Sequence, residues 1–267
     1  METSVTLLRS AYQERSAATM PGFSVVVPVH DEAGAILPLL DELVAKLRGL
    51  GPFEIVVVDD GSRDATAAEL ATARRLLPEL RVLTQDERRG QSVALATGIL
   101  AAATPVVVTM DGDGQNVPGD IPRLLERWRA TDPGQLHMVC GHREERKDRW
   151  LKRFGSRVAN AVRSRVLGDG IPDTGCGLKV FPKELFLALP RFDHMHRFLP
   201  ALAKSRGATV SVVPVRHRPR RAGRSKYGLV DRLTAGLLDL FGVWWLQRRC
   251  LAPVLRQGIA GCEEDGR

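Results

Sequence analysis

Cysteines and aromatic residues are scarce in this sequence. Only 5% of the 267 residues are aromatic, and the four cysteines, Cys140, Cys176, Cys250 and Cys262, lie far apart without CxxC or Cys/His spacing. This spacing excludes a disulfide framework and a structural zinc site, so we expect the thiols to be reduced and structural. The scarcity of aromatic side chains argues against a protein that stacks nucleic-acid bases.

Long apolar runs are also missing. Residues 1–21 carry four charges and no apolar stretch of signal-peptide length, which predicts a flexible arm on a cytoplasmic chain. No segment approaches the roughly 20 apolar residues of a membrane-spanning helix. The first predicted strand is not followed by GxGxxG, which argues against a Rossmann oxidoreductase, and a QxxRW segment typical of processive polysaccharide synthases is absent.

Positive charge is concentrated in two segments. Residues 142–165 carry nine basic and three acidic side chains, and residues 216–226 carry six basic and no acidic ones. Since the chain is +8 overall and each segment is +6, the remainder is −4. Clustered positive charge indicates an anionic partner. The few aromatic residues in or beside these segments, Trp150, Phe154 and Tyr227, favour a lipid surface or a phosphorylated substrate over nucleic acid.

Apolar periodicity predicts one α/β domain in which strands and helices alternate. The predicted strands cover residues 23–29, 54–58, 81–84, 105–110, 136–140, 177–181 and 209–215. Helix-spaced leucines between them, and a final helix from residue 229, complete the pattern. This alternation predicts a mostly parallel sheet flanked by helices, with ligands bound at the carboxyl ends of the strands.

Polar residues gather where the first two predicted strands end. They are His30 and Glu32 after the first strand, beside Pro28, and Asp59, Asp60 and Asp64 at the second, beside Gly61. Carboxylates at this edge can bind the base and ribose of a nucleotide, while Gly61 allows a tight turn beneath it. We expect Asp59 to contact a ligand, because an unpaired acid after a buried strand is costly. For Asp64, capping of the next helix is favoured.

A second acidic motif follows the strand at residues 105–110. Asp111 and Asp113 are separated by one glycine, and Gln115 adds a neutral oxygen. Two carboxylates at this spacing can face one Mg²⁺ or Mn²⁺ ion, whose remaining ligands come from a diphosphate and water. A DxD sequence alone often marks only a turn, but its position after a buried strand favours metal binding.

Seven motifs together resemble a known family. They are PVHDE, VVVDDGSRDAT, RRGQSVALATGI, VTMDGDGQNVPGDIP, DTGCGLKVF, MHRFLPAL and RRAGRSKYG. In order and spacing they resemble family 2 glycosyltransferases of the polyprenyl-phosphate branch, such as dolichyl-phosphate mannose synthase and bacterial undecaprenyl-phosphate sugar transferases. The resemblance covers about residues 22–247 and implies a GT-A fold.

The resemblance also implies roles for individual residues. The nucleotide would be held by Pro28, His30, Glu32 and Asp59. We also regard Asp60, Gly90 and Lys179 as candidate binding residues, with Lys179 and Arg143 as the alternative place for the acceptor. The metal and diphosphate would be held by Asp111, Asp113 and Gln115, and the donor and acceptor phosphates would lie near Arg143, Arg220, Ser225 and Lys226. His30 and Asp31 replace the tyrosine and asparagine common in the family, which leaves open whether the donor carries GDP or UDP. Gly114 replaces a common leucine.

The expected reaction is an inverting displacement. A phosphate monoester acceptor is already ionised at pH 7, so no catalytic base is needed. The requirement is instead to offset repulsion between two anions. The basic segment with Arg218, Arg220 and Lys226, which contains no acid for surface pairing, is predicted to do this. We therefore assign catalysis to Asp111, Asp113, Arg220 and Lys226.

Membrane contact is expected from two amphipathic helices. Residues 146–167 interleave basic and apolar side chains, and residues 227–251 carry Phe241 and two tryptophans before two arginines, interrupted by Asp239. We predict peripheral association with the cytoplasmic face of a membrane. Packing of either helix on the protein itself, or on a second copy, is the alternative.

The predicted organisation is therefore a flexible arm at residues 1–21, a GT-A catalytic domain at residues 22–226, a membrane-interface helix at residues 227–251 and a tail at residues 252–267. Two other functions remain open. One is a soluble family 2 transferase acting on a sugar or protein hydroxyl, and the other is a non-enzymatic basic lipid-binding protein. The sugar and the oligomeric state are undetermined.

Overall fold

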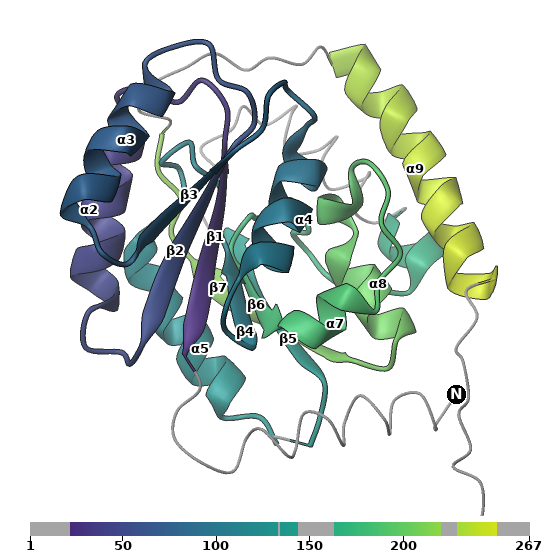
Figure 1. The fold of residues 1–267 in the computed structure, drawn as a ribbon. Helices are drawn as coiled ribbons and strands as arrows, with labels where there is room; N and C mark the ends of the chain where they lie inside the picture. Colours follow the sequence, from purple (N-terminus) through teal and green to yellow (C-terminus); the bar gives the residue numbers. More distant parts are fainter. Residues whose placement is uncertain (1–21, 133, 144–162, 220–228, 250–267) are drawn as a thin grey trace, which may run out of the picture.

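A mixed β-sheet between two layers of helices forms the body of the protein (Figure 1). The computed structural model describes residues 22–132, 134–143, 163–219 and 229–249. The strands are β1 (Phe23–Val29), β2 (Phe53–Asp59), β3 (Leu80–Thr84), β4 (Val106–Thr109), β5 (His137–Arg143), β6 (Lys179–Pro182) and β7 (Thr209–Val215). Their spatial order is β3-β2-β1-β4-β6-β5-β7.

Strand β6 interrupts an otherwise parallel arrangement. It runs antiparallel to β4 on one side and to β5 on the other, whereas β1, β2, β3 and β4 pair in parallel and β5 pairs in parallel with β7. The expectation of a mostly parallel GT-A-like sheet is confirmed. The position of β6 between two strands that precede it in the chain is an addition that the local pattern did not predict.

The helices divide between the two faces of the sheet (Figure 1). On one face lie α2 (Ile36–Leu47), α3 (Thr66–Leu76) and α5 (Ile121–Arg129), the last entered through the 3₁₀ turn η1 (Pro118–Asp120). On the other lie α4 (Gln91–Ala101), α7 (Lys183–Leu187), η2 (Met195–Arg197), α8 (Leu199–Ser205) and α9 (Leu229–Arg249). The central strands β1, β2 and β4 are therefore covered on both faces, which explains their continuous valine-rich sequences, whereas the edge strands β3 and β7 keep exposed residues.

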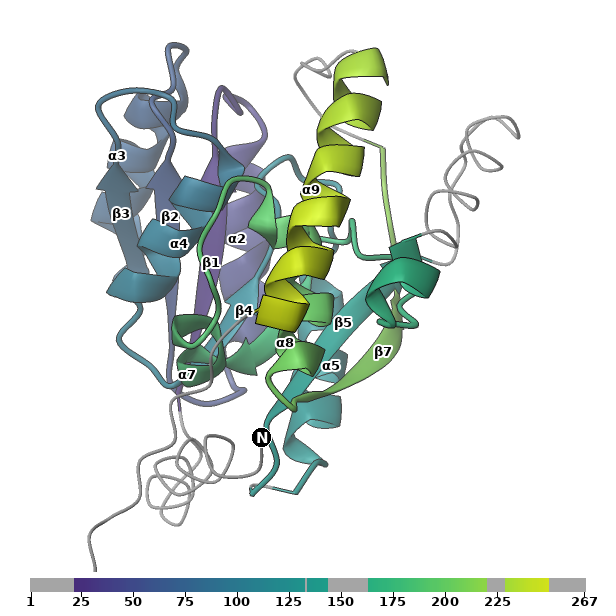
Figure 2. The same ribbon diagram turned by 90° about the vertical axis from the view of Figure 1, so that its right-hand side faces the viewer.

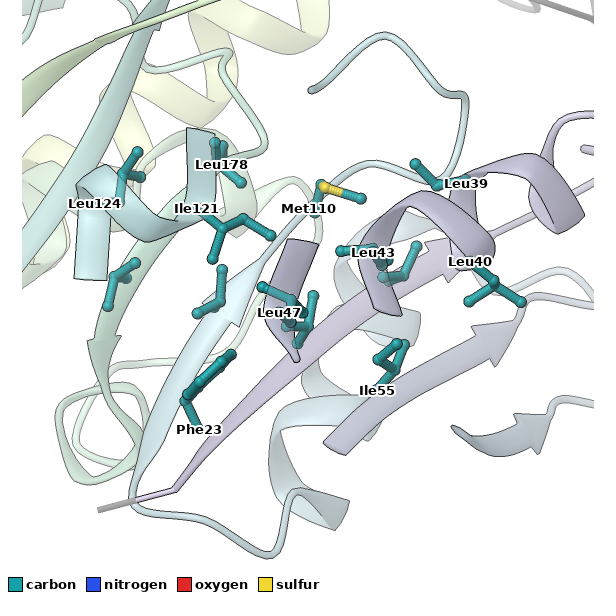
Figure 3. Close-up of a cluster of buried hydrophobic side chains, with 14 of the residues drawn as sticks. Phe23, Leu39, Leu40, Leu43, Leu47, Ile55, Met110, Ile121, Leu124 and Leu178 are labelled. Carbon is teal, nitrogen blue, oxygen red and sulfur yellow. The ribbon is translucent and has the colours of Figure 1, made fainter. Parts of the chain in front are cut away.

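Helix α2 shows how the sequence sets the packing. Its leucines at positions 39, 40, 43 and 47 recur at helical spacing and are at most 2% exposed. They lie against Phe23 and Ile55 of the sheet (Figure 3). Burial of each such side chain contributes about 1.5–3 kcal/mol. Met110 belongs to the same cluster, so the residue immediately before Asp111 is anchored in the core (Figure 3).

Helix α9 lies along the layer that contains α4, α7 and α8 (Figure 2). Its inner face packs Val243, Leu240 and Trp244 onto that layer, and Gln247 donates to the carbonyl of Ala201. Asp239, which interrupts the apolar pattern, accepts a hydrogen bond from His194 Nδ1 at 2.9 Å. The inner face of this helix therefore packs on the protein itself, which was the alternative to membrane contact.

The outer face of α9 is apolar and exposed. Leu238, Phe241 and Trp245 are 75%, 65% and 50% exposed, while the guanidinium of Arg248 lies 4.0 Å from the centre of the Trp244 ring. None of the helices in the described ranges is long and apolar enough to span a bilayer. The predicted basic helix at residues 146–167 lies largely outside the described residues, as do the arm and the tail.

Candidate functional site

The predicted acidic residues meet at the carboxyl ends of β1, β2 and β4, which are adjacent parallel strands. Asp111 lies two residues beyond the end of β4, after the buried Met110, and its Oδ1 accepts a hydrogen bond from Gln91 Nε2 at 2.8 Å. Gln91 is the first residue of α4, so the helix start and the strand end are joined through this carboxylate. A Cβ added to Gly177 would lie only 2.3–2.5 Å from the Asp111 carboxyl group. Glycine at position 177 therefore leaves the space that the carboxylate occupies.

Burial and a neighbouring carboxylate both disfavour the ionised form of Asp111. Burial, followed by the neighbouring Asp113 carboxylate, raises the pKa of Asp111 to about 6. Lys179 and Arg143 oppose this shift without cancelling it. A carboxylate in this state gains from a bound cation, because the cation favours the ionised form.

The turn after Asp111 is tightly organised. Asp113 Oδ1 accepts from the backbone N–H of Gln115 at 3.0 Å, and Asn116 Oδ1 accepts from the N–H of Asp111 at 3.2 Å. Gly114 has φ +72°, a conformation that glycine adopts readily. These contacts hold both carboxylates of the motif on one short turn.

The donor set of this turn fits a hard divalent cation. A structural zinc site needs several His, Cys, Asp or Glu side chains around one point. The described residues contain no group of three or more such side chains that could hold a metal ion, so they offer no site of the zinc type. Mg²⁺ and Mn²⁺ instead accept one or two carboxylates and complete their shell with substrate phosphates and water. Asp111 and Asp113 match that requirement.

The loop after β1 contains a residue in the left-handed conformation. Asp31 has φ +52°, and its Oδ1 accepts from the N–H of Arg63 while its own N–H donates to Ser62 Oγ. His30 Nδ1 lies 2.8 Å from the carbonyl oxygen of Asp60, so this nitrogen carries the proton. Hydrogen bonds thus hold the loops after β1 and β2 side by side. Pro28 lies in β1 just before the first of these loops, and Glu32 lies within it. Aspartate adopts this left-handed conformation more readily than most residues, which suits it to the tight turn.

Asp59 and Asp60 are more fully paired than the sequence suggested. Asp59 Oδ1 accepts from both the N–H and the hydroxyl of Ser62, so the premise that this acid is unpaired was wrong. Both oxygens of Asp60 accept backbone N–H groups, from Arg89 and from Gly90. Asp60 therefore anchors the turn that precedes α4. Any contact of Asp59 or Gly90 with a nucleotide remains a prediction.

Gly61 and Asp64 shape the same loop, and the tight turn predicted at Gly61 is observed. Gly61 has φ +63°, and an added Cβ would approach the backbone of Glu87 and Arg88 to 2.6–2.7 Å. Asp64 Oδ1 accepts from the N–H of Thr66, the first residue of α3, so Asp64 binds the start of this helix from one residue before the N-cap position, which is Ala65. These two residues shape the loop after β2 and hold it against the loop that follows β3.

A pair of buried cations lies beneath the acidic turn. Arg143 makes a two-point ion pair with Asp173, at 2.7 and 2.8 Å, and both side chains are largely buried. Lys179 is 3% exposed and donates to the carbonyl of Cys176. Both cations lower the pKa of Asp111, so they act on the site electrostatically. Direct contact of either with a phosphate is untested.

The start of the basic segment is paired with acids from elsewhere in the chain. Arg216 binds the buried Asp120, and Arg218 binds Glu42 at 2.7 Å. The segment contains no acid of its own, but Arg218 is nevertheless paired, so the absence of acids within the segment does not leave Arg218 free to bind phosphates. Arg220, Ser225 and Lys226 lie outside the described residues.

Three site residues were missed by sequence reasoning. They are Gln91, Asn116 and Asp173. Each lies within one of the recognised motifs. The roles of Gln91 and Asp173 depend on partners outside their own motifs, and the role of Asn116 depends on the geometry of its turn. Gln91 follows the glycine that precedes a predicted helix. In a parallel sheet such a helix start lies near the ends of the strands, and this position could have identified Gln91 as a site residue.

Comparison with known proteins supports the resemblance. The Glycosyl transferase family 2 pattern matches residues 24–189. The undecaprenyl-phosphate 4-deoxy-4-formamido-L-arabinose transferase of Edwardsiella ictaluri is 35% identical over 79% of this chain and 65% of its own length. The dodecaprenyl-phosphate galacturonate synthase of Rhizobium johnstonii is 32% identical over 86% of this chain and 68% of its own length. This chain thus spans about two thirds of these relatives.

A solved structure shares the fold. Glucosyl-3-phosphoglycerate synthase from Mycobacterium tuberculosis, in complex with Mn²⁺, UDP-glucose and glycerol 3-phosphate, superposes with a TM-score of 0.62. The superposition covers 90% of this chain and 82% of that one, at 20% sequence identity. At this identity the likeness shows the fold alone.

Proposed function

Since the chain belongs to glycosyl transferase family 2, we propose that it transfers a single sugar from a UDP- or GDP-sugar to a polyprenyl phosphate, with inversion at the anomeric carbon. The observation that carries this proposal is the pair Asp111 and Asp113 on one turn at the carboxyl edge of the sheet. The names of two relatives, which act on undecaprenyl and dodecaprenyl phosphate, support the choice of acceptor.

The proposed donor site uses the loops at the ends of β1 and β2. His30, Glu32 and Asp59 would bind the base and ribose, with Pro28 and Gly90 lining the same edge. Asp111 and Asp113, with Gln115, would hold Mg²⁺ or Mn²⁺ together with the diphosphate. When bound, the cation would stabilise negative charge on the departing diphosphate.

The surrounding side chains would keep the site ready for this role. Gln91 orients the Asp111 carboxylate through its hydrogen bond. Lys179 and Arg143 supply positive charge below the turn, which favours ionised Asp111. At the acceptor side, Arg220, Ser225 and Lys226 would offset repulsion between the donor diphosphate and the acceptor phosphate, so no general base is required.

The same acceptor implies a location. A polyprenyl phosphate keeps its tail in hydrocarbon and its phosphate at the headgroup plane, so the enzyme must work at a membrane surface. The exposed apolar face of α9, bordered by Arg248, supports peripheral binding there. Nucleotide sugars are cytoplasmic metabolites, and we therefore place the protein at the cytoplasmic face.

One experiment tests the function. The purified chain is incubated with Mn²⁺, a short-chain polyprenyl phosphate and a panel of UDP- and GDP-sugars, and the lipid is analysed by mass spectrometry. We expect one donor to add the mass of a single sugar residue to the lipid, and Asp113→Ala to abolish the product. Transfer to a soluble sugar or peptide hydroxyl instead, with the lipid unchanged, would overturn the proposed acceptor.

A further inference from the structure

The three residues after β7 lie across the turn that carries the two acidic residues. We call this segment, Arg216 to Arg218, the strap. His217 forms an antiparallel bridge with Asn116, and the N–H of Arg218 donates to the carbonyl of Gln115 at 3.0 Å. The strap and the turn are about 100 residues apart in sequence, so this contact belongs to the tertiary fold.

The guanidinium group of Arg218 binds the turn at two points. Its Nε donates to the carbonyl of Gly114 at 2.8 Å, and its Nη2 donates to the carbonyl of Asn116 at 3.3 Å. The same Nη2 lies 2.7 Å from Glu42 of α2, which fixes the plane of the guanidinium. A planar group with several fixed donors can satisfy this arrangement, whereas a lysine ammonium cannot reach all three acceptors in one geometry.

The bound carbonyls flank the part of the turn that aims Asp113. Gly114 follows Asp113 directly and has φ +72°, and the Asp113 carboxylate is itself held by the N–H of Gln115. The Gly114 carbonyl and the N–H of Gln115 belong to the same peptide plane, so rotation of that plane would move the carboxylate. Arg218 holds this plane from outside the turn, while Asn116 holds the other end through the N–H of Asp111.

From these contacts we infer that Arg218 is a positioning residue for the metal-binding turn. It acts on the cation through the backbone of Gly114 and Asn116, which fixes the direction of the Asp113 carboxylate. This role rests on the metal site of the proposed function. It replaces the phosphate contact that the basic composition of the segment suggested for Arg218.

The test measures Mn²⁺ binding by the full chain. Mn²⁺ is titrated into the protein, alone and with UDP or GDP present, and the electron paramagnetic resonance signal of free Mn²⁺ is followed. Because loss of a supporting group around metal ligands typically costs 10–100-fold in affinity, we expect Arg218→Lys to weaken Mn²⁺ binding at least about tenfold. The variant keeps the positive charge, so the loss reports the lost planar geometry.

Two variants serve as controls. Arg216→Lys alters the neighbouring arginine, which binds Asp120 and not the carbonyls of the turn. Glu42→Gln keeps an oxygen acceptor for Arg218 but removes the charge. Both should bind Mn²⁺ within about threefold of the unmodified protein, because the bonds to Gly114 and Asn116 persist. Thermal unfolding of each variant shows whether any loss merely follows the folded fraction.

The outcomes separate the possible explanations. Unchanged Mn²⁺ affinity in Arg218→Lys would overturn the inference, as would equal losses in Arg218→Lys and Arg216→Lys that match a common loss of stability. Failure of the unmodified protein to bind Mn²⁺ would overturn it too. Because no acceptor is present in the titration, failure of the proposed lipid acceptor would leave this comparison intact.

Discussion

Asp111 and Asp113 sit in different surroundings although only one residue separates them. Asp111 is paired with Gln91 and lies above two buried cations, whereas Asp113 is held by its own turn. The two carboxylates therefore depend on different parts of the protein. The position of Asp111 depends on the contact between the start of α4 and the end of β4. The position of Asp113 depends on its turn and on the strap.

Removal of either carboxylate should nearly abolish transfer. We expect Asp111→Ala and Asp113→Ala each to lower kcat by on the order of 10² to 10⁴, because the charge on the departing diphosphate would lose its main stabilisation. The measurement is steady-state transfer with saturating donor, repeated for the unmodified protein in excess EDTA. Full activity in EDTA would contradict a metal-assisted reaction.

His196 should make stability depend on pH in the acid range. Its Nδ1 lies 2.8 Å from the Ser92 hydroxyl, and burial, followed by the nearby Arg197, lowers the pKa of His196 to about 3. Between that value and the ordinary pKa near 6.5, the unfolded chain binds a proton that the folded chain does not, so stability falls as the pH falls. The slope from this residue should approach 1.4 kcal/mol per pH unit.

Urea unfolding at several pH values isolates this contribution. Other groups also titrate in acid, so the quantity to compare is the difference between the unmodified protein and His196→Gln. We expect the advantage of the unmodified protein to shrink steadily from pH 6.5 to pH 4.5. A difference that stays constant over this range would show that His196 does not titrate on unfolding.

Helix α9 has two apolar faces with different partners. Trp244 packs inward and stacks with Phe241 at 5.5 Å between ring centres, while Trp245 and Leu238 point outward. The sequence suggested both tryptophans as membrane contacts. The structure makes Trp244 a poor test residue, since its removal would also disturb the core.

Replacement of the outer face should weaken membrane binding. We expect Leu238→Ser combined with Trp245→Ser to reduce cosedimentation with anionic vesicles severalfold, because these side chains supply exposed apolar area beside Arg248 and Arg249. Donor binding should be unchanged. Salt should release part of the unmodified protein, since screening weakens attraction between the arginines and anionic lipid. Equal vesicle binding by the double variant would refute a lipid role for this face.

The basic segment beyond the strap should act late in the reaction. We predict that Arg220→Ala and Lys226→Ala lower turnover on a polyprenyl phosphate far more than they weaken nucleotide binding, because repulsion between the two anions arises only when both are bound. Kinetics with titrated donor and acceptor, beside equilibrium binding of the nucleotide, would separate the effects. Short-chain and long-chain acceptors should respond equally, and unchanged turnover would place the acceptor phosphate elsewhere.

Across the whole molecule, local pattern predicted the elements and long-range contacts completed the site. The first strand was predicted at its observed bounds, because a run of buried β-branched residues ends sharply at His30. The pairing of β6 was not predictable, since periodicity does not encode which strands become neighbours. Likewise, the acids at strand ends were evident, but the partners Gln91 and Glu42 are 20 and 176 residues away from the groups they hold.

Strand β6 also determines when the two halves of the sheet can pair during synthesis. Strands β1, β2 and β3 already find partners among one another within the first 84 residues, but β5 pairs only with β6 and β7, which emerge later. Until residue 182 has left the ribosome, one edge of β4 and both edges of β5 stay open to other chains. Hydrogen exchange on ribosome-stalled nascent chains of increasing length should therefore show protection of β1 and β2 amides before those of β5 and β7. Simultaneous protection would mean that the sheet assembles in one cooperative step, with no interval in which the open edges invite aggregation.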